Sequence, residues 1–193
     1  MSEPQNLLLH CCCAPCTISC ADRISDESIN FELFWYNPNI HPFTEYKSRK
    51  EALIKYSEAK NLSLNINDEY DPKLFINSVF NVMENDDGCR CEICYKMRLD
   101  KTAEFARERG FDAFSTSLLI SPYQNHKIII KVCEEAAKKY GVNFFYRDFR
   151  PLFRQSQNKA RSLEFYMQKY CGCIFSDAEN GAKNKTQRQM GKK

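Results

Sequence analysis

Long hydrophobic runs are missing from this sequence. No apolar stretch approaches the roughly 18 residues that span a membrane, which argues against a membrane-spanning protein and predicts no membrane partner. The first residues, MSEPQN, also lack the basic region and the apolar core of a secretory signal peptide. The chain is therefore expected in the cytoplasm, where thiols stay reduced.

Internal repeats and breaks in composition are absent as well. The 193 residues are 43% hydrophobic and 27% charged, as in a soluble globular protein with one core. We expect one domain over residues 1–177. Residues 178–193 contain no aromatic residue and no acidic residue beyond Glu179, which predicts a basic, disordered tail.

Cysteine is the residue that the sequence has in excess. Its eleven cysteines are an odd number, which rules out a fully paired disulfide framework. In a reducing compartment they are better explained as metal ligands or redox groups. Ten of them form an N-terminal group (Cys11, Cys12, Cys13, Cys16, Cys20), a middle group (Cys89, Cys91, Cys94) and a C-terminal group (Cys171, Cys173). Because the groups are far apart in sequence, we expect one site that the fold assembles.

The apolar pattern alternates between strand and helix. Strands are predicted at residues 7–10, 29–37, 62–67, 111–121 and 142–149, and helices at 44–60, 72–85, 91–109, 125–140 and 156–169. This alternation predicts an α/β protein, with a mostly parallel sheet and helices on both faces. Sites in such folds form at the carboxyl ends of the strands. The cysteines that directly follow the first strand therefore lie where a site is expected.

The number of thiols favours an iron–sulfur centre over zinc, and zinc over a pure dithiol enzyme. Either metal centre uses at most four thiolates, yet seven cysteines remain when Cys11, Cys20 and Cys89 are set aside. The surplus predicts a second metal, or a thiol pair that cycles to a disulfide. A zinc-stabilised RNA-binding module and a thiol-disulfide oxidoreductase are the alternative functions.

Five further residues invite a role. Asp112 and Asp148 lie near strand ends, where each is either a cap or ion-pair partner, or an oxygen ligand or proton donor. His10 is expected to be structural, and His41 to be a loop residue that can touch substrate. Cys133 falls on the apolar stripe of a helix, which predicts a small core residue.

Positive charge is unevenly distributed, although the net charge is only +3. Residues 147–161 carry five basic side chains against one acidic side chain, with aromatic residues between them. Such a segment attracts phosphates and can stack on unpaired bases. A solvated basic surface explains the charge equally well.

Five motifs occur in order between residues 6 and 177: HCCCAPC, CRCEICYKMRL, DAFSTSLLISPYQNH, FFYRDFR and YMQKYCGCIFS. Together they resemble the cobalamin-independent epoxyqueuosine reductase family, QueH. The first family motif matches Cys12, Cys13 and Cys16. The second and the last match the following residues: Cys91, Cys94, Tyr95, Arg98, Leu99 and 170–173.

The resemblance implies an oxidoreductase that removes the epoxide oxygen of epoxyqueuosine at the wobble position of a tRNA anticodon, which yields queuosine. It implies a catalytic nucleotide-binding-type domain of the PP-loop or HUP-like kind. The stretch after the first strand contains no glycine, so ATP use is not expected. The implied cofactor is a [4Fe–4S] cluster. The thiol surplus adds an iron ion, and the electrons come from an unknown donor protein or reductant.

The motifs, the strand ends and the basic segment together predict the site residues. The metal ligands are expected to be Cys12, Cys13, Cys91, Cys94, Cys171 and Cys173. Catalysis is expected from Cys13, Cys16, Asp112 and Asp148, and substrate binding from Arg150, Arg154, Tyr123 and His126. The anticodon loop of tRNA is the expected partner.

Overall fold

The computed structural model describes residues 4–80 and 87–179. Its strands are β1 (Asn6–His10), β2 (Asn30–Trp35), β3 (Leu64–Ile66), β4 (Ala113–Thr116) and β5 (Asn143–Phe144). They form one five-stranded sheet in the order β3-β2-β1-β4-β5, and every neighbouring pair is parallel. This is the strand order of open, doubly wound nucleotide-binding sheets.

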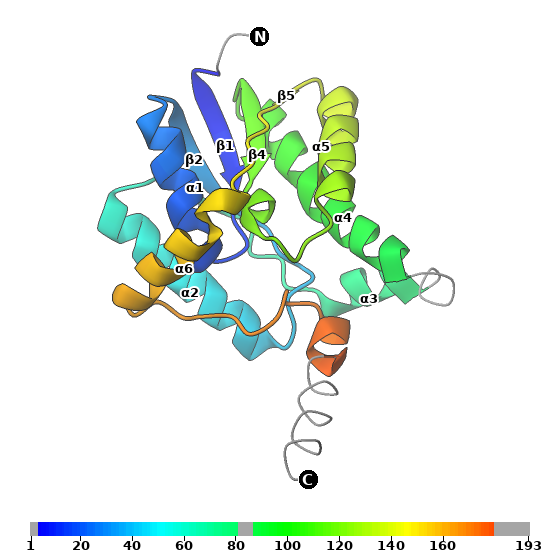
Figure 1. Ribbon diagram of the computed structural model, residues 1–193. Helices are drawn as coiled ribbons and strands as arrows, with labels where there is room; N and C mark the ends of the chain where they lie inside the picture. The colour runs from blue at the N-terminus through cyan, green and yellow to red at the C-terminus, as the bar shows by residue number, and fades with distance from the viewer. Residues whose placement is uncertain (1–3, 81–86, 180–193) are drawn as a thin grey trace.

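Helices cover both faces of the sheet (Figure 1). One face carries α1 (Ala14–Asp26), α2 (Phe43–Lys60) and α6 (Phe153–Ser162), and the other carries α4 (Asp87–Glu108) and α5 (His126–Tyr140). The short helix α3 (Pro72–Phe80) packs against α4. The predicted α/β class, with a parallel sheet between two helical layers, is confirmed.

Strand β1 lies at the centre of the core. Its residues Leu7, Leu8 and Leu9 are completely buried, as expected of a parallel strand that is covered on both faces. The chain runs from β1 toward β2 and later returns to β4 on the other side. His10 is paired with Thr116, so the loops after β1 and β4 begin side by side. This reversal of strand order creates the crevice in which such folds bind ligands.

Several predicted elements have different bounds. Helix α1 was not predicted. The strand expected at 111–121 has only four residues, and a 3-10 helix, η1 (Ser117–Ile120), follows it. The Thr116 hydroxyl accepts a hydrogen bond from the Leu118 amide, which turns the chain out of the sheet. The strand expected at 142–149 pairs with β4 over two residues only, Asn143 and Phe144.

The predicted helix ends need correction too. Helix α2 begins at Phe43 with Pro42 at its N-cap, so Thr44 is not the cap. The helix predicted at 156–169 is α6, which follows a 3-10 turn, η2 (Arg150–Leu152), and ends before Glu164, whose φ is 55°. The end of the helix predicted at 72–85, and most of the predicted tail, lie outside the described residues. Within the described ranges, no helix is both long and apolar enough to cross a membrane.

Candidate metal centre

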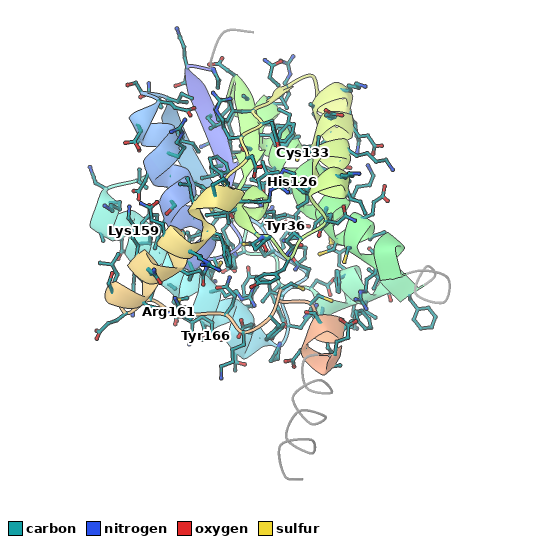
Figure 2. The ribbon with its side chains drawn as sticks, viewed as in Figure 1. Tyr36, His126, Cys133, Lys159, Arg161 and Tyr166 are labelled. Carbon is teal, nitrogen blue, oxygen red and sulfur yellow. The ribbon has the colours of Figure 1, made fainter. Side chains whose placement is uncertain are left out.

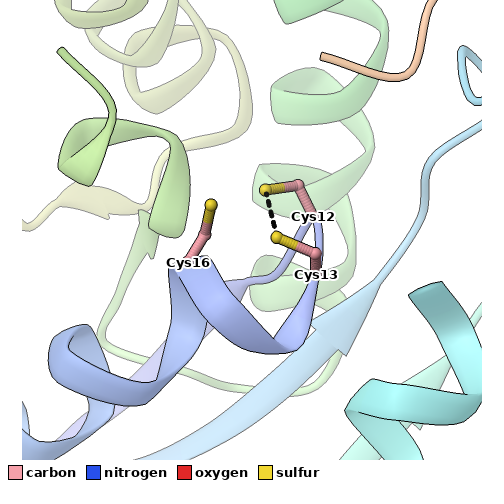
Figure 3. A group of neighbouring side chains, drawn as sticks. All are labelled: Cys12, Cys13 and Cys16. Atoms are coloured by element: carbon pink, nitrogen blue, oxygen red, sulfur yellow. Dashed lines mark hydrogen bonds between the residues drawn. The ribbon is translucent and has the colours of Figure 1, made fainter. Parts of the chain in front are cut away.

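The N-terminal cysteine group bends around the start of α1. Pro15 occupies the first turn of the helix, where its missing amide proton costs nothing. Cys12 and Cys13 precede the helix and Cys16 follows one turn later, so all three side chains point to one space (Figure 3). Their sulfur atoms all lie within 4.8 Å of one another, and the Sγ atoms of Cys12 and Cys13 are 3.7 Å apart.

The loop after β4 orients Cys12 from the other side of the crevice. The Cys12 amide donates to the Ser117 Oγ at 3.2 Å, and the same hydroxyl donates to the Cys12 sulfur at 3.6 Å. Gln168 donates from Nε2 to the Cys16 sulfur at 3.4 Å. Both cysteines are therefore held by side chains that are distant in sequence.

One cavity of about 790 Å³ brings the three cysteine groups together. Its lining includes Cys12, Cys16, Cys91, Cys94, Cys171 and Cys173. Cys13, the remaining motif cysteine, lies beside Cys12. Among the residues outside this cavity, Cys133 is buried on α5 (Figure 2). The side chain of Cys89 lies outside the described part of the chain.

A buried guanidinium neutralises charge among the thiols. Arg98 is 3% exposed and lies one helical turn after Cys94. It donates from Nε to the Cys94 carbonyl at 3.0 Å and from Nη2 to the Cys94 sulfur at 3.2 Å. Its charge also interacts with Cys12 and Cys171, so it faces all three cysteine groups.

The thiols of the N-terminal group do not all ionise by themselves. Hydrogen bonds from Cys13 and Cys16 hold the pKa of Cys12 well below its usual value. Burial raises the pKa of Cys13, and the hydrogen bond to Cys12 raises that of Cys16. Burial also raises the pKa of Cys94 to about 11, although Arg98 opposes this. Close thiolates repel one another, and a metal cation removes that penalty.

The donor set fits a thiolate-bound metal. A tetrahedral metal with bonds of about 2.3 Å to sulfur holds neighbouring sulfurs about 3.8 Å apart. The Cys12–Cys13 separation of 3.7 Å is close to this value, and the third sulfur is near enough to join. Soft thiolate ligands select zinc, copper(I) and iron–sulfur centres over calcium or magnesium. This cysteine group can therefore bind a metal.

Arg49, in α2, holds the C-terminal cysteine group in place. It is 1% exposed and donates to the carbonyl oxygens of Tyr170 at 2.9 Å and Cys171 at 3.1 Å. Glu45, one turn earlier, accepts from the Arg49 Nε at 2.7 Å and completes a buried ion pair. The guanidinium thus joins a helix of one layer to the segment that carries Cys171 and Cys173.

Gly172, between these two cysteines, has no room for a side chain. Its φ is +115°, a conformation that L-residues rarely adopt. A Cβ atom at this position would lie 2.9 Å from the Ile40 side chain and 3.1 Å from the Arg49 Nη1. Its carbonyl also accepts from the His41 amide at 2.7 Å. The close approach to the core therefore explains the glycine in C-G-C.

Gly172→Ala is expected to lower both thermal stability and the amount of bound metal. The strained conformation alone costs about 1–3 kcal/mol, and the new methyl group displaces the backbone that carries Cys171. Gly141→Ala is the matched control, because Gly141 also has a positive φ, of 65°, but nothing lies within 4 Å of its Cβ position. The measurements are the melting temperature and the metal content. Equal metal contents in the two variants would contradict this account.

A model of the family described as "Epoxyqueuosine reductase QueH" matches residues 7–179 of the chain. The chain belongs to this family. A QueH relative from Dehalococcoides mccartyi is 41% identical over 177 residues, which cover 92% of this chain and 95% of the relative. A QueH relative from Thermotoga maritima is 37% identical over 185 residues, which cover 92% and 93%.

One solved structure supports the fold. The crystal structure titled as a predicted subunit of tRNA methyltransferase from Methanocaldococcus jannaschii superposes with a TM-score of 0.54. The superposition covers 80% of this chain and 74% of the other chain, and the sequence identity is 11%. The likeness therefore concerns the backbone architecture of this QueH family member.

The two predicted aspartates do not fit the cysteine site. Asp112 precedes β4, so it lies at the amino edge of the sheet, where its carboxylate accepts from the amides of Gln5 and Asn6. The site forms beyond the other end of that strand, about 13 Å away at roughly 3.3 Å per residue. Asp148 accepts from Arg150 at 2.8 and 2.6 Å, which lowers its pKa to about 2. The ion pair therefore stabilises its ionised form, which disfavours a role as proton donor.

Of the four predicted substrate-binding residues, only Tyr123 lines the cavity. His126 contacts Tyr146 on the α5 side (Figure 2), with 3.2 Å between its Nε2 and the phenol oxygen. The charge of Arg150 is bound by Asp148. Arg154 is exposed on α6 and is not among the described residues that line the cavity.

His10 and His41 have structural roles. His10 is fully buried between β1 and β4, where its ring contacts the Thr116 hydroxyl at 2.9 Å. Burial lowers its pKa to about 4, so its ring is neutral at pH 7. His41 was expected to be a loop residue within reach of substrate, but it is 3% exposed. Its backbone amide and carbonyl bind Gly172 and Tyr170, which fastens the C-terminal cysteine segment.

Proposed function

We propose that this chain is an epoxyqueuosine reductase that acts on tRNA. Its family membership and the meeting of three cysteine groups in one cavity support this activity. The reaction breaks two carbon–oxygen bonds of the epoxide and consumes two electrons and two protons. The oxygen leaves as water, and a new double bond forms between the two carbons that carried it. A redox centre beside a cavity that admits a modified base meets these needs.

The proposed metal ligands are the six cysteines Cys12, Cys13, Cys91, Cys94, Cys171 and Cys173. When bound, a [4Fe–4S] cluster supplies single electrons and a further iron ion supplies a Lewis acid for the epoxide oxygen. The support for two centres is the number of thiols, because one cluster uses at most four of them. Cys16, which contacts Gln168, is the motif cysteine left outside this ligand set, and we propose that it acts in catalysis together with Cys13.

The rest of the site holds and neutralises these groups. Arg98 offsets negative charge at the thiolates, and Ser117 fixes the orientation of Cys12. Tyr95 lines the same cavity and donates to Gln124 at 2.5 Å, which fixes the loop after β4. We propose that the basic side chains of Arg150 and Arg154, together with His126, contact the tRNA outside the cavity. An external donor protein or reductant in the cytoplasm is proposed to supply the electrons.

Anaerobic reconstitution tests this function. The purified chain is loaded with iron and sulfide, then mixed with tRNA that carries epoxyqueuosine and with dithionite as the reductant. We expect brown protein, acid-labile sulfide, iron beyond the four atoms of one cluster, and conversion of epoxyqueuosine to queuosine. Stoichiometric zinc without labile sulfide, and an unchanged epoxide, would instead indicate a zinc-stabilised RNA-binding module. Four irons with a thiol pair that disappears in a single turnover would replace the second iron by a redox disulfide.

A further inference from the structure

Four of the five cationic side chains of the cavity fall into two tiers, and the fifth, Arg90, pairs with Glu179 at 2.9 Å. Five basic residues line it (Arg49, Arg90, Arg98, Arg161 and Lys169), against the single acidic residue Glu179 in the described lining. Arg49 and Arg98 form the inner tier, because they are buried and bonded to the cysteine segments. Arg161 projects from α6 (Figure 2), and both it and Lys169 are exposed. This outer tier faces whatever approaches from solvent.

An aromatic pair, the exposed Tyr123 and the half-buried Phe153, also lines this cavity. Tyr123 is 86% exposed although it lines the cavity, and its ring meets that of Phe153 edge to face, with 5.7 Å between the centroids. The turn that carries Tyr123 is fixed from below, because the Tyr95 hydroxyl donates to Gln124 and accepts from the Asn125 amide. The exposed ring of Tyr123 is therefore carried by a turn that hydrogen bonds hold in place.

We propose that Tyr123, Phe153, Arg161 and Lys169 form a docking rim for a single-stranded RNA loop. A base beside the reacting nucleotide stacks on Tyr123, and the loop phosphates lie on Arg161 and Lys169. The reacting base then enters the cavity toward the cysteines. This inference rests on the proposed function, because it assigns where that substrate enters.

The chemistry of the rim fits a loop better than a duplex. Unpaired bases expose their faces and stack on aromatic side chains, whereas the faces of paired bases are covered by their neighbours. Two cations match a short run of phosphates and not a long helical backbone. Outside the rim, Arg150 forms an ion pair with Asp148 and Lys159 pairs with Asp22 at 2.7 Å, so the charges of these two residues are offset by carboxylates.

Binding of two RNAs to the reconstituted full chain tests the rim. One probe is an anticodon stem-loop, and the other is a hairpin of equal length that is paired almost throughout. Tyr123→Ala should weaken stem-loop binding by about tenfold, within the range of one lost base stack, without changing the salt dependence. Tyr123→Trp should restore it. Arg161→Ala and Lys169→Ala should each reduce the slope of log affinity against log salt by about 0.7.

Arg107→Ala is the matched control, because Arg107 is exposed near the far end of α4 and does not line the cavity. It should leave both affinity and slope unchanged. Wild-type affinity in Tyr123→Ala, unchanged slopes in the two cation variants, or equal binding of both RNAs would overturn the rim. Turnover of epoxyqueuosine tRNA separates the two proposals. Rim-dependent binding without turnover refutes the function alone, and normal turnover with rim-independent binding refutes the rim alone.

Discussion

Cys94→Ser is expected to abolish both iron binding and epoxide reduction, whereas Cys133→Ala costs only packing. Cys94 is 8% exposed, lines the cavity with the other cysteine groups and accepts a hydrogen bond from Arg98. A serine hydroxyl is a hard ligand that stays protonated, so a soft metal loses one of its anionic donors. Cys133 is completely buried but lies on the apolar face of α5.

The measurements are iron and sulfide content, turnover and chemical denaturation. Cys133→Ala should retain iron and lose about 1 kcal/mol of unfolding free energy, as for one buried group of this size. Cys94→Ser should keep its far-ultraviolet circular dichroism, so that loss of iron is not loss of fold. If the Cys133 variant folded normally and yet lost its iron, the division between site and core cysteines would be wrong.

The sheet could be predicted because the apolar pattern of its strands agrees with their burial. The run Leu7–Leu9 is apolar and fully buried, so its pattern and its environment agree. Helix α1 escaped prediction because most of its residues are buried. Many of these buried residues are small or polar, such as Thr17 and Ser19. A helix without an exposed polar face lacks the period on which sequence analysis depends. The run 117–120 was assigned to a strand because a short apolar run fits either structure.

The candidate site was predictable where chemistry is visible in residue type. Cysteines at short spacings indicate a thiolate site. The carboxyl end of β1 is where a site is expected in this fold. The structure adds the residues that hold these cysteines in place. The types of these supporting residues do not by themselves indicate a site. Arg49 has only its partner Glu45 four residues earlier as a hint, a spacing common on any helix surface. Asp112 was misjudged because it lies next to a strand, but at the wrong end of it.

Arg98→Met is expected to lower the reduction potential of the proposed cluster and to slow turnover. Methionine keeps much of the apolar volume of the side chain but removes the charge and the hydrogen bond to the Cys94 sulfur. Reduction adds negative charge to the centre, so a nearby cation stabilises the reduced form more than the oxidised form. Hydrogen bonds to cluster sulfurs act in the same direction. Removing both therefore makes the cluster harder to reduce.

The expected shift is on the order of 60 mV to more negative potential, which corresponds to tenfold in a one-electron equilibrium. Spectroelectrochemical titration of the reconstituted protein measures it without reference to activity. Arg98→Lys should restore part of the potential, because it returns the charge without the planar, two-point geometry. Arg107→Met is the control on the same helix, since Arg107 is exposed and its loss changes only surface charge. An unchanged potential in Arg98→Met with full iron content would mean that the guanidinium only supports the fold of α4. A lowered potential with intact circular dichroism would mean that the buried charge tunes the electron transfer on which epoxide reduction depends.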